Sequence, residues 1–379
     1  SYIRQYPEQW LWLHKRWKST PLRKVAILSD GKKGHLNQSL AVFEEIKKAR
    51  REFGYSDTDT AEKIIEIGYK DSAKRILMML MAPLVSYFCL LRMRLLKYCL
   101  SPACYDEIKG AYADIIISCG SQTAPVNLLL SRENCSKSIT LMKPPVIPVR
   151  NFDIVIVPEH DRPADRENIV KTIGMPNMIS PKKVESDLKS LERVTDLGNK
   201  KNIGLLIGGD NKNYSIDASL VSKVLENVAG AAQELDANIL VTTSRRTSME
   251  VGNLIKAKLG NNSRAKLLII ASERNPEWAV GGILGASSVV VVSGESTSML
   301  SEAASSGRHV IAFRPYKRPM APGNNKHEAF LKRLSLSGFI RLSEVSNLKD
   351  NIVGLAESDE EPKRLNDSEK IYEAVKRIV

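Results

Sequence analysis

The sequence predicts an α/β fold built from two Rossmann-like domains, with a cleft between them. Short apolar runs alternate with segments of helical spacing along most of the 379 residues, a pattern typical of parallel, doubly wound sheets. The alternation stops at the polar residues 180–201 and then begins again. Polar motifs, several with glycine, follow most of the apolar runs, and parallel sheets bind ligands at the carboxyl ends of their strands.

The first domain is predicted to extend from residue 23 to residue 185. Its first apolar run ends in Asp30 and Gly31, and residues 39–51 then place apolar side chains on one helical face. Further apolar runs continue the alternation. The predicted strands are residues 25–29, 64–67, 115–118, 139–142 and 154–157.

Residues 180–201 contain proline, glycine and many charges, and we interpret them as the interdomain linker. The second domain, residues 200–360, repeats the alternation, and residues 361–379 are expected to form a C-terminal helix. Two successive α/β domains of similar size are typical of the GT-B architecture of glycosyltransferases. The predicted strands are residues 203–207, 239–243, 267–270, 289–292 and 310–313, and the predicted helices are residues 220–235, 247–259 and 298–306.

The net charge of +13 favours anionic partners. Outside residues 1–22, the sequence has no basic run with interleaved aromatic residues and no nucleic-acid-binding module. Nucleic acid is therefore not expected as a partner. Phosphates on small molecules and lipids fit the charge better. The five cysteines are odd in number and lack metal-site spacing, which indicates reduced thiols and a cytoplasmic protein.

Residues 76–91 form a strongly apolar segment without a charge. As a helix this segment would span about 24 Å, less than the roughly 30 Å of a bilayer core, and Pro83 would kink it. It is therefore either a buried core helix or an element that dips into one leaflet. Lysines and arginines on both sides can pair with lipid phosphates and favour the second interpretation, a membrane-associating insert of residues 74–100.

The chain begins with an aromatic and basic segment, residues 1–22, which includes the string YPEQWLW at residues 6–12. Such a composition suits an interfacial helix at lipid headgroups and also an ordinary docking helix. The string resembles the C-terminal tail of the late acyltransferases of lipid A synthesis. The resemblance implies a fused or partner acyltransferase, but no acyltransferase catalytic motif follows, so acyl transfer is not assigned to this chain.

A glycine-containing turn follows the first predicted strand, where residues 30–38 read DGKKGHLNQ. Its glycines permit close approach of the backbone to a ligand, and the next helix offers free N–H groups to an anion. The expected acceptor-binding residues are Lys32, Lys33, Gly34, Asn37, Gln38, Ser118 and Gly120.

Transfer to a hydroxyl needs a general base, and the first domain offers Asp30, His35, Glu159, His160 and Asp161, of which the first three are taken as the catalytic residues. His35 titrates near neutral pH, and Asp30 stands at a strand end. Glu159 follows the strand at residues 154–157.

The second domain carries motifs that suit a nucleotide. Hydroxyl groups at a helix start can receive phosphate oxygens, and adjacent arginines can bind a diphosphate or a sugar carboxylate in bidentate fashion. These groups would neutralise phosphates without a metal, so no metal or cofactor is expected. The candidate donor-binding residues are Gly208, Gly209, Ser244, Arg245, Arg246, Glu295, Ser296, Thr297, Ser298 and Glu302.

Short motifs occur along the chain in an order that resembles that of the elongated-mitochondria fission family of plants and its bacterial relatives. The resemblance runs from about residue 25 to residue 342, and the apolar insert is its largest departure. Glu302 would then accept ribose hydroxyls, as the corresponding glutamate does in many GT-B enzymes. The motifs are SDGK at residues 29–32, SCG at 118–120, VPEHD at 157–161, TIG at 172–174, IGG at 207–209, TSRRT at 243–247 and SGESTSM at 293–299.

We therefore expect a membrane-associated glycosyltransferase of envelope lipopolysaccharide synthesis, peripheral on the cytoplasmic face of the inner membrane. It would transfer Kdo or a similar sugar from a nucleotide donor such as CMP-Kdo to a lipid A-type, phosphorylated glycolipid. Two alternatives remain: a nucleotide-sugar epimerase of the same fold, and a non-enzymatic interaction scaffold.

Overall fold

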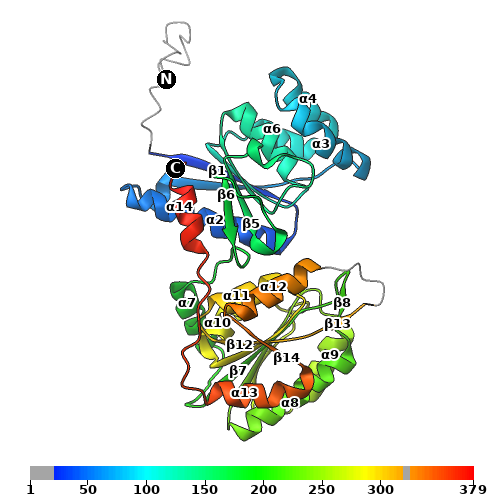
Figure 1. Cartoon of the computed structure of the whole chain (residues 1–379), viewed down its shortest axis with the longest axis vertical. Coiled ribbons are helices and arrows are strands. Elements are labelled where there is room, and N and C mark those ends of the chain that lie inside the picture. The colour runs from blue at the N-terminus through cyan, green and yellow to red at the C-terminus, as the bar shows by residue number, and fades with distance from the viewer. Residues whose placement is uncertain (1–20, 319–324) are drawn as a thin grey trace.

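A computed structural model describes residues 21–318 and 325–379, and this part of the chain contains two parallel six-stranded sheets, one in each half (Figure 1). The predicted α/β class and the GT-B architecture of two Rossmann-like domains are confirmed. The tail helix expected at residues 1–22 falls, except for its last two residues, outside the described part.

The first sheet has its strands in the order β2-β1-β3-β4-β5-β6. The strands are β1 (Arg23–Ser29), β2 (Thr60–Glu66), β3 (Ile115–Cys119), β4 (Lys137–Leu141), β5 (Ile154–Pro158) and β6 (Ile169–Thr172). The helices are α2 (Lys33–Glu52), α3 (Ser72–Val85), α4 (Cys89–Cys99), α5 (Pro102–Lys109) and α6 (Ala124–Asn134). Strands β3 and β5 are buried along their whole length, as expected where both faces of a sheet are covered. The edge strand β6 escapes sequence prediction because it is short and only partly buried.

The second sheet has its strands in the order β10-β9-β7-β11-β12-β14. The strands are β7 (Asn202–Ile207), β9 (Asn238–Thr243), β10 (Ala265–Ile269), β11 (Val289–Ser293), β12 (His309–Phe313) and β14 (Arg341–Ser343). The helices are α8 (Ala218–Glu234), α9 (Met249–Leu259), α10 (Ala279–Ala286), α11 (Thr297–Ser305), α12 (Asn325–Leu336) and α13 (Leu348–Ala356). A small antiparallel pair, β8 (Tyr214–Ser215) and β13 (Tyr316–Lys317), lies outside the main sheet.

The interpretation of residues 180–201 as a linker is wrong for their first half. These residues form α7 (Pro181–Glu192), which packs closely on α10 of the second domain. Glycine permits this approach, because a β-carbon at Gly281 would lie only 2.1 Å from Oδ2 of Asp187. The segment looks polar in sequence because only one face of the helix, with Val184 and Leu191, contributes to the core.

The end of the chain returns to the first domain. Helix α14 (Ser368–Val375) lies beside α2 in Figure 1, and its Ile371 and Val375 join the apolar cluster around β1 and α2. Just before this helix, the carboxylate of Asp367 accepts hydrogen bonds from the backbone N–H groups of Ile173 and Gly174 at 2.9 and 2.7 Å. The chain thus crosses from the second domain back to the first.

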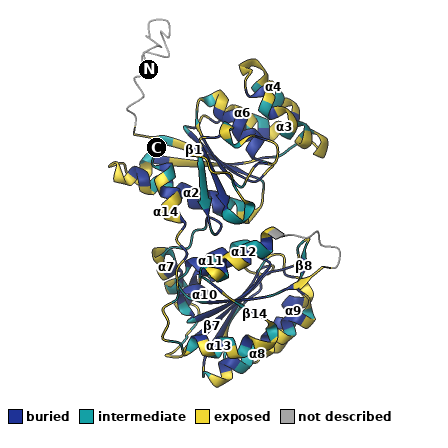
Figure 2. Ribbon diagram, viewed as in Figure 1, coloured by how far each residue is buried: buried dark blue, intermediate teal, exposed yellow. Residues whose placement is uncertain are grey.

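The apolar segment at residues 76–91 folds as parts of two helices, α3 and α4, with a break at residues 86–88. Figure 2 shows both buried and exposed residues along these two helices. The buried residues lie on one side, and the exposed ones include large apolar residues such as Leu84 (63% exposed) and Leu90 (78% exposed). We call the exposed side the α3–α4 patch. Its large apolar members are Ile76, Leu80, Met81, Leu84, Tyr87, Phe88, Leu90, Leu91 and Tyr98.

Among the described residues, no helix has both the length and the apolar character needed to cross a bilayer.

Candidate functional site

The first candidate motif surrounds the turn between β1 and α2. Gly31 has a φ of +76°, a conformation that side-chain-bearing residues rarely adopt. The carboxylate of Asp30, whose side chain is only 1% exposed, accepts hydrogen bonds from Nζ of Lys32 at 2.8 Å and from Nδ1 of His35 at 3.0 Å. The structure therefore joins two of the predicted catalytic residues into one pair.

The two partners of this pair differ in charge at neutral pH. Burial acts to raise the pKa of Asp30, but the hydrogen bond from Lys32 and the nearby charges outweigh it and lower the pKa below its ordinary value. Burial lowers the pKa of His35, despite the attraction of Asp30. The pair is then a carboxylate and a neutral imidazole, so Nδ1 donates to Asp30 and Nε2 keeps its lone pair. This arrangement orients a general base.

The turn after β3 lies against the imidazole ring. A β-carbon at Gly120 would lie 3.0 Å from Cε1 of His35, and Gly120 itself has a φ of +89°. Two other predicted acceptor-binding residues point inward instead. Ser118 is fully buried and its hydroxyl bonds to Thr140 at 3.1 Å, while the buried Gln38 contacts the thiol of Cys119. Ser118 and Gln38 therefore support the strand end. Of the other predicted acceptor residues, Lys32, Lys33 and Gly34 are exposed and Asn37 is half-buried.

Glu295 is the centre of the motif in the second domain, and its side chain is 0% exposed. Its Oε1 accepts a hydrogen bond from the N–H of Gly209 at 2.9 Å and lies 4.0 Å from the guanidinium of Arg246. Its Oε2 has no hydrogen-bond partner among the described residues. Burial raises the pKa of Glu295 to about 7. A side chain this deep holds the turns after β7 and β11 together and does not present its carboxylate to solvent.

The glycines after β7 make room for protein atoms. A β-carbon at Gly208 would lie 1.6 Å from Oε1 of Glu295, and one at Gly209 would lie 2.2 Å from the carbonyl oxygen of Arg246. The sequence suggested that these glycines admit a ligand. In the structure, the Glu295 carboxyl and the backbone of Arg246 fill that space.

The two adjacent arginines after β9 differ in their surroundings. The guanidinium of Arg246 donates to the carbonyl of Asp210 at 3.2 Å, and its backbone N–H donates to the hydroxyl of Ser244 at 3.1 Å. Arg245 is exposed and forms no ion pair or hydrogen bond through its side chain with a described residue. Arg245 is therefore the arginine available to a ligand, while Arg246 and Ser244 shape the loop.

The start of α11 meets the start of α2 from the other domain. Ser296 caps α11 through a hydrogen bond from the N–H of Met299 at 3.4 Å. A β-carbon at Gly34 would lie 3.7 Å from Oγ of Ser298. One turn further along α11, burial raises the pKa of the half-buried Glu302 to about 7, and the positive charge of Lys33 opposes this rise. Two helix N-termini, a lysine and a carboxyl group therefore converge where the domains meet.

Glu159, the third catalytic candidate, lies elsewhere. It follows β5, three strands from β1 in the sheet, which corresponds to about 14 Å. Its carboxylate forms an ion pair with Arg333 of α12 at 2.9 Å, and the neighbouring Asp161 pairs with Lys326 at 2.7 Å. These contacts join the two domains. The sequence offered no signal for them, because the partners are more than 160 residues apart.

The chain matches one described protein family over most of its length. The model of the family described as Mitochondrial fission ELM1 matches residues 33–378. An uncharacterized protein of Rickettsia prowazekii, RP120, is 26% identical over an alignment of 313 residues that covers 72% of this chain and 81% of that protein.

Solved structures of two UDP-GlcNAc 2-epimerases are similar in fold. The enzyme from Methanocaldococcus jannaschii has 10% identity and a TM-score of 0.54, with 92% of this chain and 97% of that chain covered. The enzyme from Neisseria meningitidis, bound to UDP-GlcNAc, has 12% identity and a TM-score of 0.51, with 94% and 97% covered. At such identities the likeness concerns the fold alone.

Proposed function

The chain belongs to the mitochondrial fission ELM1 family, and we propose that it is a sugar-nucleotide-dependent enzyme that transfers a sugar to a phosphorylated glycolipid. The observation that carries this proposal is the convergence of Lys33 and His35 on α2 with Ser298 and Glu302 on α11. A positive charge and two helix N-termini favour phosphate between the domains. A neutral imidazole stands on the first-domain side of the same region.

The donor is proposed to bind on the second-domain side. The hydroxyls of Thr297 and Ser298, both half-buried at the start of α11, would receive the phosphate oxygens, and the exposed Arg245 would close over them. Glu302 would accept the ribose hydroxyls. One solved structure of this fold is bound to UDP-GlcNAc, which supports a sugar nucleotide as the ligand.

His35 is proposed as the general base. Its Nε2 would take the proton of the acceptor hydroxyl while that oxygen attacks the anomeric carbon. The bond between this carbon and the nucleotide phosphate breaks, and the negative charge that develops on the phosphate lies near Lys33. Asp30 fixes the imidazole through Nδ1, at 3.0 Å, and stabilises the imidazolium that forms.

The acceptor is proposed to be a lipid held at a membrane surface. The α3–α4 patch is apolar and exposed, and Lys74, Arg75, Arg94 and Lys97 lie along the same two helices. Such a surface suits an anionic leaflet. The specific proposal is transfer of Kdo or a similar sugar from CMP-Kdo to a lipid A-type acceptor on the cytoplasmic face of the inner membrane, with an acyltransferase as a fused or partner protein.

A nucleotide-sugar epimerase is the second candidate. Two UDP-GlcNAc 2-epimerases have folds similar to this chain, with TM-scores of 0.54 and 0.51. An epimerase needs no lipid acceptor: it would invert one carbon of the sugar, and its product would stay in the aqueous phase.

Thermal stabilisation by a panel of nucleotides and their sugar conjugates tests the proposal. A ligand at about a hundred times its Kd adds roughly 2.7 kcal/mol to the free energy of unfolding. We expect one nucleotide among CMP, UDP, GDP and ADP to raise Tm, and we expect the Glu302→Ala variant to lose this stabilisation. The exposed Arg193→Ala variant serves as a control and should respond like the wild type.

Product analysis with the stabilising sugar nucleotide then separates the two enzymes. Labelled sugar in the lipid phase supports transfer, and an epimerised sugar in the aqueous phase, on its nucleotide or free, supports the second candidate. No stabilisation by any nucleotide would contradict both and favour an interaction scaffold.

A further inference from the structure

The connection between β4 and β5 crosses the first sheet without an α-helix. Parallel neighbours need a crossover, which is usually helical. Here residues 142–153 make the crossing, with a single 3₁₀ turn, Val149–Asn151, and with Pro144, Pro145 and Pro148 before it. Because proline fixes φ, this segment holds its shape with little loss of conformational entropy.

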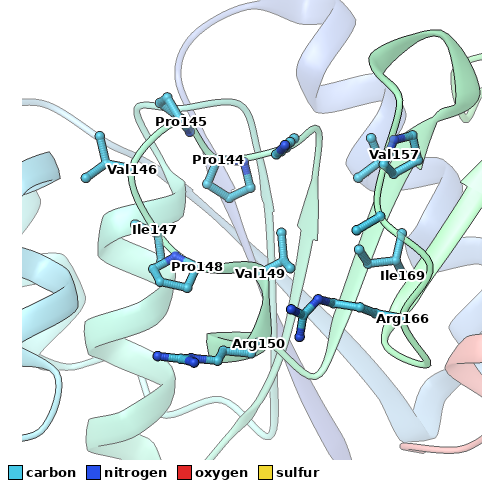
Figure 3. A pocket seen from close by; sticks show the side chains of 13 residues that line it. Pro144, Pro145, Val146, Ile147, Pro148, Val149, Arg150, Val157, Arg166 and Ile169 are labelled. Carbon is cyan, nitrogen blue, oxygen red and sulfur yellow. The ribbon is translucent and has the colours of Figure 1, made fainter.

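A pocket of about 420 Å³ lies between this crossing and the loop that follows β5 (Figure 3). Its volume is within the range of small-ligand sites. Thirteen residues line it, most of them proline, valine or isoleucine. The buried Ile147 and Val157 form part of its wall. The pocket therefore offers a preformed apolar surface to a ligand.

The charged residues of the pocket all have the same sign. Its lining includes Lys143, Arg150 and Arg166 and no carboxylate. None of these three side chains forms an ion pair or hydrogen bond with a residue in the described part of the chain. Figure 3 shows Arg150 and Arg166 at one end of the pocket, and Pro144 and Pro145 at the other. Lys143 directly precedes Pro144 in the chain, so positive side chains flank the apolar lining on both sides, with the two arginines together at one end.

We propose that this pocket binds a small organic phosphate with an apolar body, of the prenyl phosphate kind. Arginine recognises phosphate through paired N–H groups, so Arg150 and Arg166 would take the phosphate. The proline-rich wall would take the hydrocarbon. The lining shares no residue with the candidate donor, acceptor or catalytic residues, so this site is independent of the proposed transfer reaction.

Isothermal titration of the full chain with farnesyl phosphate tests this site, with farnesol and inorganic phosphate as comparison ligands. Farnesyl phosphate should bind more tightly than either comparison ligand, since each carries only half of the recognised chemistry. The Arg150→Ala/Arg166→Ala variant should bind at least about tenfold more weakly, because it loses the charge-assisted hydrogen bonds. The Lys182→Ala/Arg193→Ala variant removes the same charge from exposed positions at α7 and should bind like the wild type.

A second variant keeps the charges and fills the space. Ala164 is exposed and lines the pocket, so Ala164→Trp should occupy the pocket without disturbing the core and should abolish binding. Circular dichroism confirms the fold of each variant. No binding by the wild type would overturn the proposal. Equal binding by the wild type and the two pocket variants would also overturn it. A loss of binding seen only with Leu90→Glu would place farnesyl phosphate on the α3–α4 patch instead.

Discussion

The buried carboxyl of Glu295 should make the stability of this protein depend on pH. Its pKa rises from 4.5 to about 7 on folding, because the side chain is completely buried. Between pH 4.5 and about 7, the folded chain therefore keeps a proton on Glu295 that the unfolded chain has lost. The stability linked to this proton is present at acidic pH and is lost as pH rises through about 7. Between pH 5 and pH 8 the free energy of unfolding should fall by about 2 to 3 kcal/mol on account of this one group.

The Glu295→Gln variant tests this reasoning. Glutamine keeps an acceptor for the N–H of Gly209 and cannot ionise, so the fall between pH 5 and pH 8 should shrink by about 2 to 3 kcal/mol. Urea unfolding followed by circular dichroism at both pH values gives the free energies. Any pH-independent cost of the substitution cancels in the comparison.

A matched control is Glu344→Gln, which changes a carboxylate of the same domain that is 67% exposed. This variant should keep the wild-type pH dependence. If Glu295→Gln also keeps it, the Glu295 carboxyl does not hold a proton in the folded chain, and its assignment as a buried positioning residue fails.

Three further predictions concern the glycine turn, the base and the membrane. Gly208→Ala should lower the free energy of unfolding in urea by roughly 1 to 3 kcal/mol. Adding Glu295→Ala should recover part of this loss, whereas strictly additive effects of the two substitutions would argue against contact between residues 208 and 295. The transfer rate should fall on acidification as His35 gains a proton, with the midpoint of the fall below the ordinary histidine pKa of 6.5 because burial lowers the pKa of His35; a midpoint above 6.5 would exclude His35 as the base. Leu90→Glu should reduce co-sedimentation with anionic vesicles about tenfold or more. The control Leu336→Glu, at a site 76% exposed on α12, should leave co-sedimentation unchanged. Equal losses in both variants would exclude the α3–α4 patch as the membrane-binding surface.

Several features of the candidate site follow from local sequence. Asp30 and His35 are five residues apart, and a strand end followed by a glycine turn and a helix start is enough to bring them together. Ser296 caps α11 as its place before a helix predicts. These pairs lie within a few residues, so the backbone geometry of a single turn decides them.

Other features depend on contacts that no short string can encode. Gly208 looked like a ligand-facing glycine, yet its space is occupied by Glu295, 87 residues further along the chain. Glu159 looked like a candidate base, but Arg333 binds its carboxylate across the domain boundary. Whether a polar residue meets a ligand or another part of the chain depends on what the fold places against it.

The sequence by itself determined the alternation of strands and helices, the two-domain class and the positions of the glycine turns, because periodicity and turn chemistry act over a few residues. Only the tertiary structure decided that α7 packs on α10, that α14 returns to α2, and that the start of α2 meets the start of α11. It also decided that the apolar segment buries one side and exposes the other. Burial and charge are properties of surfaces assembled from distant parts of the chain, and so they appear only when the chain has folded.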